Sequence, residues 1–390
     1  MKKWNCYSIW AIIGIFIVSI VACDGIFNEE NGIIQVFERQ PAPGITRNYN
    51  DILPVNDGWI AVGRSHGSPL DAIIVKYDLQ GLKVWERGFG SSNSLDEFYS
   101  IMEITNGYIV RAMLSPVGRG ISVVIKFDKD GNLIWAKNLS VNAIAVNEFG
   151  FVGIGGIKSN KKNTLFVAQY DVNGNILWRN QIGNDLNLYG SINPHWDEVL
   201  NISKIMNCLD GYFLYGNTMS VFPATGTTSE GLSFVAKLSE DGKFLWQRTI
   251  EINNFCNITL VNDGIVIAGS VWNDSGRIPY VKKYDFEMEL IWKTQYEHNN
   301  FIVFQGITKV GEDIFVSIFR SVGGGSFVSG INSCGKRFWN SEISNETHTL
   351  YSNIFAIDGG FVVNAYHSPS GKNSFLIFES NTLNGISDTD

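Results

Sequence analysis

Aromatic, imidazole and carboxylate side chains gather in two long segments near the middle of the chain. Residues 184–201 and 218–231 lengthen the interval between Trp178 and Trp246, the longest between successive members of a tryptophan series described below. Long segments in a compact domain are often functional, and aromatic side chains anchor many binding surfaces. We predict a binding surface here for a protein or glycan partner; loops without a function are the alternative. Its residues are Tyr189, His195, Trp196, Asp197 and Phe222.

The other chemistry-bearing residues form no recognisable catalytic or metal site. No two of the five histidines are three or four residues apart, and neither His-Glu-x-x-His nor Gly-x-Ser-x-Gly occurs. Residues 128–132 begin like a calcium loop but lack its glutamate at the twelfth position, so a hairpin turn is the better interpretation. His66 and His367 could approach one another, but a third ligand is missing. We predict no catalytic residue, no metal and no cofactor.

Two short sequence elements repeat along the chain and predict its architecture. The first is a turn that ends in glycine and leads into an apolar run; its glycines are Gly58, Gly107, Gly150, Gly211, Gly264 and Gly360, with a displaced copy at Gly311. The second is a turn followed by a strand that contains tryptophan, and its tryptophans are Trp85, Trp135, Trp178, Trp246, Trp292 and Trp339. Glycine closes tight turns between antiparallel strands. Each unit therefore predicts four short antiparallel strands.

The tryptophan strands are one fewer than the glycine elements, so one strand must come from elsewhere. Residues 33–39 match the missing strand, with Phe37 in the tryptophan position, and residues 374–378 form a third strand that has no partner after it. Pairing the two would remove two open sheet edges. We predict an all-β chain in which residues 33–390 form one domain, a seven-bladed β-propeller of four-stranded antiparallel blades closed by the N-terminal strand.

The order of a glycine turn, a third strand and Asp-x-x-Gly-x-x-x-Trp resembles the tryptophan-docked propeller repeats of exported bacterial proteins. It is similar in style to pyrroloquinoline-quinone-type repeats, and the resemblance covers nearly all of the chain. In that family the tryptophan lies between neighbouring blades, which implies a structural blade-docking role for the six tryptophans. The quinoprotein repeat runs Asp-x-x-x-Gly, whereas here Asp78 and Gly81 are three positions apart. The resemblance implies an architecture and leaves the function open.

The first residues resemble an export signal. Lys2 and Lys3 precede an apolar stretch over residues 9–21, which is shorter than the roughly 20 residues of a membrane span. Residues 20–23 resemble the bacterial lipobox, which implies removal of residues 1–22 and attachment of lipid, including an acyl chain such as palmitate, to Cys23. Residues 23–32 would then be a lipidated tether, and the protein would lie in the bacterial cell envelope. An ordinary secretory signal or a membrane anchor is the alternative.

Composition excludes several classes of function. Charged residues make up 17% of the chain, and loss of Lys2 and Lys3 with the signal moves the formal net charge from −8 to −10. An acidic exported domain is a poor partner for nucleic acid, because phosphate binding depends on Lys and Arg. Beyond the anchor, only Cys208, Cys256 and Cys334 remain. We expect buried or free thiols, with one unassigned pair as the alternative.

These observations predict an exported, membrane-anchored lipoprotein whose β-propeller is a non-catalytic binding or scaffolding platform in the cell envelope. The alternative is a propeller enzyme that acts on a glycan or similar polymer at the central funnel. Two carboxylates separated by roughly 5 to 10 Å at the funnel would favour the enzyme.

Overall fold

The structure is a computed structural model, and it describes the chain in segments. These are residues 38–39, 46–66, 71–90, 96–114, 120–159, 162–182, 197–221, 228–250, 255–273, 276–296, 302–320, 326–344, 349–357, 360–367 and 372–379. Strands and turns make up this part of the chain, and it contains no helix that could span a bilayer.

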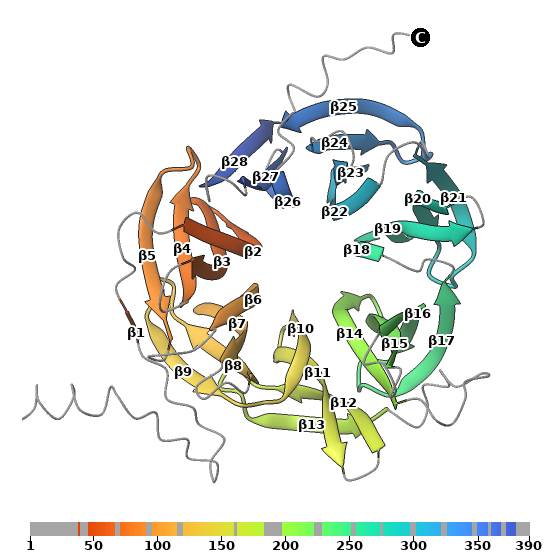
Figure 1. The fold of residues 1–390 in the computed structure, drawn as a ribbon. Coiled ribbons are helices and arrows are strands. Elements are labelled where there is room, and N and C mark those ends of the chain that lie inside the picture. The colour runs from red at the N-terminus through yellow and green to blue at the C-terminus, as the bar shows by residue number, and fades with distance from the viewer. Residues whose placement is uncertain are drawn as a thin grey trace, which may run out of the picture.

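Antiparallel sheets surround a central opening, as in a β-propeller (Figure 1). Apart from β1 (Glu38–Arg39), which lies at the outer edge of the first sheet, the first strand of each sheet is innermost and the following strands are added outward in chain order. The first three sheets contain β2 (Thr46–Val55), β3 (Gly58–His66), β4 (Ala72–Asp78) and β5 (Lys83–Phe89); β6 (Glu97–Ile104), β7 (Gly107–Leu114), β8 (Ile121–Phe127) and β9 (Leu133–Lys137); and β10 (Val141–Asn147), β11 (Gly150–Ser159), β12 (Lys162–Tyr170) and β13 (Ile176–Gln181).

The second half of the chain continues the same order. Its sheets contain β14 (Asp197–Cys208), β15 (Gly211–Val221), β16 (Thr228–Leu238) and β17 (Phe244–Ile250); β18 (Phe255–Val261), β19 (Gly264–Asn273), β20 (Gly276–Tyr284) and β21 (Leu290–Gln295); β22 (Ile302–Val310), β23 (Asp313–Arg320), β24 (Ser326–Ile331) and β25 (Arg337–Ser344); and β26 (Thr349–Ile357), β27 (Gly360–His367) and β28 (Lys372–Glu379). The prediction of four-stranded antiparallel units therefore describes most of the chain correctly.

The prediction of seven four-stranded blades closed by the N-terminal strand is wrong. Within the described residues, six sheets reach the four strands of a complete blade, and the sheet β26–β28 has three. The N-terminal strand β1 (Glu38–Arg39) does not pair with β28; it pairs antiparallel with β5 as a fifth strand of the first sheet, with Glu38 opposite Phe89. Both β5 and β28 offer an open edge, but β5 is far closer in the chain, so pairing there closes a much shorter loop.

The ring is closed by packing between sheets instead of a shared strand. Tyr49, Ile52 and Trp59 of the first sheet form one buried cluster with Val362 of the last sheet. The Asn364 side chain donates a hydrogen bond across the same boundary to the carbonyl of Tyr49 (3.3 Å). The other apolar clusters likewise lie between neighbouring sheets, so burial of apolar area holds the blades to one another.

Several of the repeated glycines occupy positions that exclude a side chain. Gly58 has φ +147°, and a Cβ there would lie 1.9 Å from the carbonyl oxygen of Tyr77 in the neighbouring strand. Gly131 has φ +78°, and its Cβ would lie 2.7 Å from the ring of Trp85 in the preceding blade. At Gly58 and Gly131, backbone or an indole is thus too close for any side chain.

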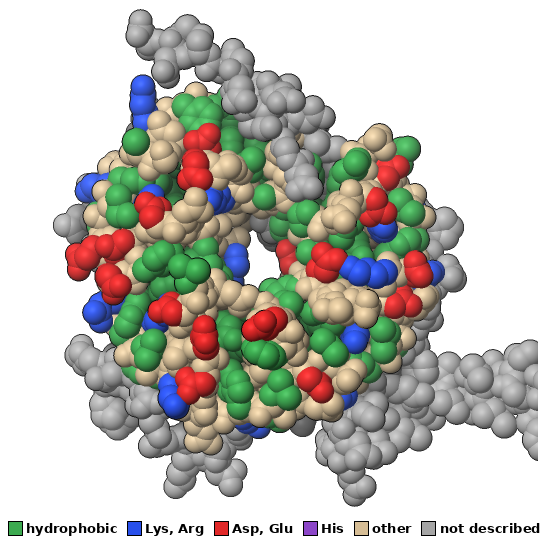
Figure 2. Space-filling model, turned by 180° about the vertical axis from the view of Figure 1, so that it is seen from behind, with side chains coloured by type: hydrophobic (Ala, Val, Ile, Leu, Met, Phe, Trp, Pro, Cys, Tyr) green, Lys and Arg blue, Asp and Glu red, His purple; other side chains and the backbone are tan. Residues whose placement is uncertain are grey.

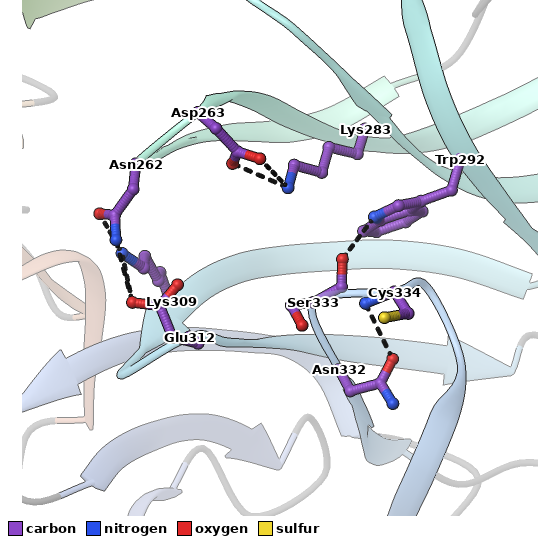
Figure 3. Close-up of polar contacts among 9 residues, drawn as sticks. All are labelled: Asn262, Asp263, Lys283, Trp292, Lys309, Glu312, Asn332, Ser333 and Cys334. Atoms are coloured by element: carbon purple, nitrogen blue, oxygen red, sulfur yellow. Dashed lines mark hydrogen bonds and ion pairs between the residues drawn. The ribbon is translucent and has the colours of Figure 1, made fainter.

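The tryptophans lie in the fourth strands, counted outward, of the six complete blades, and each of the six is half-buried. The contact between β21 and the next blade is typical: the Trp292 indole N–H donates to the carbonyl of Ser333 (2.9 Å), over the turn that contains Gly335 (Figure 3). At the boundary where glycine is missing, Met288 packs in the same cluster as Trp246. These four-residue turns therefore lie against an indole of the preceding blade, except in the first blade, where Gly81 lies near Trp59 of its own sheet.

Polar contacts on the turns reinforce the blades. The Lys283 ammonium, on a side chain only 9% exposed, binds the carboxylate of Asp263 in the turn before β19 (2.8 Å), as Figure 3 shows. Lys76 and Asp57 form the same pair in the first blade (2.6 Å). Because each lysine crosses from the third strand to the first turn of its own blade, the pair fixes the end of the sheet.

Candidate functional site

The predicted rim residues are largely outside the described part of the chain. Tyr189, His195, Trp196 and Phe222 all lie there, as does Cys23. Asp197 is the first residue of β14, where its backbone pairs with Val221. Much of the extra sequence in this blade forms longer strands, because β14 has 12 residues and β15 and β16 have 11 each. The segment 218–231 is therefore strand over part of its length.

A different set of residues converges on the centre of the ring, because each innermost strand of the complete blades has a β-bulge at the same register. The bulged residues are Asn50, Tyr99, Asn142, Ser203, Cys256 and Gln305. A bulge re-aims the side chains around it. The residues that follow are Asp51, Ser100, Ala143, Lys204, Asn257 and Gly306. In the last sheet the bulge is displaced, to between Thr349 and Tyr351.

A ring of isoleucines fixes this level of the propeller. One isoleucine follows each of these positions, and its counterpart in the last sheet is also isoleucine: Ile52, Ile101, Ile144, Ile205, Ile258, Ile307 and Ile354. All are at most 5% exposed. Each isoleucine packs between neighbouring blades. The residue that precedes each isoleucine is therefore held at the same height along the central axis.

Five of these positions, Asp51, Ser100, Ala143, Lys204 and Asn257, line a central cavity of about 380 Å³. The innermost strand of every sheet contributes to its wall, and Figure 2 shows the opening at the centre of one face. Its charged residues, within the described wall, are Asp51, Arg111 and Lys204. Small-molecule sites in proteins have volumes of about 300 to 1,000 Å³, so the cavity is large enough for one small ligand.

Asp51 is the acidic residue of the cavity. Its carboxylate accepts hydrogen bonds from the backbone N–H of Ile52 (3.0 Å) and from that of Ile101 in the next blade (2.9 Å). Burial raises the pKa of Asp51 to about 6, although these two amides and the charges of Lys204 and Arg111 oppose the rise. The carboxylate therefore joins two blades and titrates near neutral pH.

Arg111 projects toward the cavity from β7, where it lies opposite Ser100. Its guanidinium carbon lies 4.5 Å from the centroid of the Tyr99 ring, so the cation rests on the bulged tyrosine. Burial lowers the pKa of Arg111, but it keeps its charge because the pKa of an arginine starts far above neutrality. No carboxylate lies within ion-pair distance of this guanidinium in the described segments.

Lys204 supplies the second cation from β14. Its ammonium donates to the backbone carbonyl of Ile258 in the next blade (3.0 Å) and lies 3.4 Å from the side-chain oxygen of Asn257. These two contacts hold the ammonium at the boundary between the sheets β14–β17 and β18–β21. Asn257 also accepts from the N–H of Ile258 (2.9 Å), as Asp51 does from Ile52.

Beside the cavity, a hydrogen-bonded set holds the first two blades together. The Asn50 amide donates to the Glu97 carboxylate (2.9 Å) and to the carbonyl of Phe98 (2.7 Å). Arg64 lies 3.6 Å from the same carboxylate. Glu97 is therefore engaged by Asn50 and Arg64 and is not part of the cavity wall.

The cavity can bind a polar ligand, but its described wall holds a single carboxylate. The paired carboxylates of a glycosidase are thus not found among the described lining residues. Likewise, no group of three or more His, Cys, Asp or Glu residues suited to a metal occurs in the part of the chain that the structure describes.

The described cysteines carry free thiols. Cys334 is exposed in the turn before β25. Cys208 is half-buried, and the Lys237 ammonium lies 2.9 Å from its sulfur. The side chain of Cys256 is outside the described set.

The sequence matches no family model and none of the curated proteins. Among solved structures, semaphorin 2a of Drosophila has a TM-score of 0.51 at 7% identity, covering 88% of this chain and 76% of that one. A variant of the apocarotenoid oxygenase of Synechocystis has a TM-score of 0.48 at 10% identity, covering 90% and 92%. The structure named the Dos1 propeller has a TM-score of 0.42 at 10% identity, covering 85% and 91%. Likenesses at such identities concern the fold alone.

Proposed function

We propose that this chain is a binding β-propeller of the bacterial cell envelope, anchored by lipid at Cys23, which holds a small polar ligand in its central cavity without transforming it. The observation that carries the proposal is the cavity itself, about 380 Å³ in volume, whose wall combines polar side chains from several blades with three half-buried charged residues. A packed propeller axis would need no charges there, and charges are costly to remove even partly from water. Asp51, Arg111 and Lys204 are therefore best explained by a ligand.

The lipid anchor has its own test. Growth of the expressing bacterium with an alkyne-labelled palmitate should label the wild-type protein, and Cys23→Ser should abolish the label. Cys334→Ser, which removes an exposed thiol of the propeller, is the matched control and should keep it. Equal labelling of the wild type and Cys23→Ser would contradict the anchor without affecting the cavity.

Ligand binding is tested by blocking the cavity. Ser203 lies in the cavity wall and is exposed to it, so Ser203→Trp should fill the space with an indole. Leu209→Trp places the same indole on a turn where the native side chain is 95% exposed. In a thermal-shift panel of sugars, sugar acids, amino acids and nucleosides, wild type and Leu209→Trp should share at least one ligand that Ser203→Trp has lost. Retention of every ligand by Ser203→Trp would refute binding in the cavity.

One observation favours an enzyme as the second candidate. A carboxyl group with its pKa raised to about 6, as at Asp51, is suited to general acid catalysis near neutral pH. Incubation of the wild type with the ligand found in the panel, followed by mass spectrometry, separates the two. Unchanged ligand supports a binding protein, whereas a product that Asp51→Asn no longer forms would establish the enzyme.

A further inference from the structure

The charges of the cavity are unequal, and this difference points to the class of ligand. The described wall contains two cations, Arg111 and Lys204, and one carboxylate, that of Asp51. Two backbone amides already hydrogen-bond this carboxylate. The wall therefore has an excess of positive charge, although the whole chain is acidic. The net positive charge of the cavity wall is opposite in sign to the net charge of the whole chain. It is therefore a local feature of the cavity.

Arg111 is arranged to receive an anion. Its guanidinium carbon lies 4.5 Å from the centroid of the Tyr99 ring, so a cation–π contact holds the guanidinium in the cavity wall. A planar guanidinium held in this way matches the two oxygens of a carboxylate. Since no carboxylate of the described residues pairs with Arg111, a ligand carboxylate would be its ion-pair partner.

The sheet between the two cations leaves room for the ligand. Arg111 belongs to the sheet β6–β9 and Lys204 to the sheet β14–β17, which are separated by β10–β13. At the same register, β10 has only the small Ala143. Ala143 therefore occupies little of the space between the two cations, and this space is available to a ligand.

The remaining wall is rich in neutral hydrogen-bonding groups. Hydroxyl and amide side chains line the cavity alongside the charged ones: Ser100, Asn142, Ser203, Asn257, Thr259 and Thr308. Such groups both donate and accept, so they suit ligand hydroxyls. The volume of about 380 Å³ is near the lower limit for small-molecule sites, which indicates a single sugar-sized molecule and not a polymer.

We infer that the central cavity binds a small polyhydroxylated carboxylate, of the size and chemistry of a hexuronate, with its carboxylate on Arg111 and toward Lys204 and its hydroxyls on the neutral wall. This rests on the proposed function and specifies its ligand. The two cations select the carboxylate, while the serine, threonine and asparagine side chains distinguish a sugar acid from a simple carboxylic acid.

Isothermal titration of the full mature chain tests the ligand class with three probes. D-glucuronate carries both features, D-glucose has the hydroxyls without the carboxylate, and acetate has the carboxylate without the hydroxyls. Glucuronate should bind at least tenfold more tightly than either of the others. Equal affinities for glucuronate and glucose, or for glucuronate and acetate, would overturn the inference.

Variants then test the residues. Arg111→Gln should weaken glucuronate binding by about tenfold to a hundredfold, the usual effect of losing a hydrogen bond to a charged group, and should leave any glucose binding unchanged. Arg111→Lys keeps the charge but loses the planar guanidinium, and Lys204→Gln removes the second cation. Each should weaken glucuronate binding. These two variants test the inference if Arg111→Gln fails to fold. Lys243→Gln is the control, because Lys243 is 74% exposed and pairs with Asp241 on a turn.

The outcomes separate this inference from the proposed function. Unchanged glucuronate binding in Arg111→Lys and Lys204→Gln would overturn the ligand class and its assigned residues. If glucose binds as well as glucuronate and Ser203→Trp abolishes both, the cavity is a binding site but the carboxylate assignment is wrong. If the wild type binds none of the three probes, the inference fails, and the wider panel decides the proposed function independently.

Discussion

Replacing Asp51 with asparagine should make the protein more stable at neutral pH, which is unusual for a residue in a candidate site. The pKa of Asp51 rises from 3.8 to about 6 in the folded protein, chiefly because of burial. Between these two values the folded state holds a proton that the unfolded state has lost. The contribution is thus fully present below about pH 4 and is lost as the pH rises through about 6.

The size of the effect on the free energy of unfolding follows from the pKa shift of Asp51. Two pKa units correspond to about 3 kcal/mol, so the native aspartate should lower the free energy of unfolding at pH 7.5 by up to about that amount relative to a group that cannot ionise. Asparagine is such a group, but its single oxygen can accept from only one of the two amides, because Ile52 and Ile101 donate to different carboxylate oxygens of Asp51. Loss of that hydrogen bond costs about 1 kcal/mol at every pH. The variant should therefore be slightly less stable than the wild type near pH 4 and more stable than it at pH 7.5.

Urea unfolding, followed by tryptophan fluorescence at pH 4.5, 6 and 7.5, measures the difference directly. Asp57→Asn is the control of opposite sign, because pairing with Lys76 lowers the pKa of Asp57; its contribution is present above about pH 4 and lost as the pH falls. Since Asp57 is exposed, that variant should lose less than about 1 kcal/mol at pH 7.5. A difference between wild type and Asp51→Asn that does not change with pH would refute the assignment.

Three further outcomes are expected. Gly131→Ala should reduce the free energy of unfolding by more than about 1 kcal/mol, because alanine is strained at φ +78° and its Cβ would lie 2.7 Å from the Trp85 ring; urea unfolding against Gly156→Ala, where nothing lies within 4 Å, checks this. Lys283→Gln should cost less than about 1 kcal/mol by the same measurement, because the carboxylate that it leaves unpaired, that of Asp263, is 65% exposed and is solvated by water, and a loss above about 2 kcal/mol would contradict it. Combined replacement of Tyr189 and Trp196 with alanine should abolish capture of a protein or glycan partner from envelope extracts without lowering the melting temperature, and undiminished capture would remove the rim prediction.

The repeated glycines and tryptophans predicted the local architecture because each acts within one turn or one blade boundary. Gly58 and Gly131 sit where backbone or an indole excludes a side chain, so their spacing reports the strands directly. Closure of the ring could not be predicted in the same way. Residues 33–39 resemble an outer strand, but nothing in such a strand specifies which of two open edges it joins, and β1 joined β5.

The cavity residues escaped sequence analysis because no motif contains them. Asp51, Arg111 and Lys204 are single residues from three different blades, and they lie in one cavity wall only because the blades form a ring. A signal was present nonetheless: an isoleucine precedes the second strand by six positions in each sheet, as Ile52 precedes Gly58. Aligning the repeats on it would have shown that the residue just before the isoleucine is charged at Asp51 and Lys204, where Ser100, Ala143 and Gly306 stand in other blades.

A crystal structure of the mature protein grown with D-glucuronate tests the central claim most directly. The account predicts one molecule in the central cavity, with its carboxylate oxygens within hydrogen-bond distance of the Arg111 guanidinium and its hydroxyls on the neutral side chains of the wall. A bound glucuronate found only on the outer rim, with the cavity beside Asp51 and Lys204 holding water alone, would contradict it.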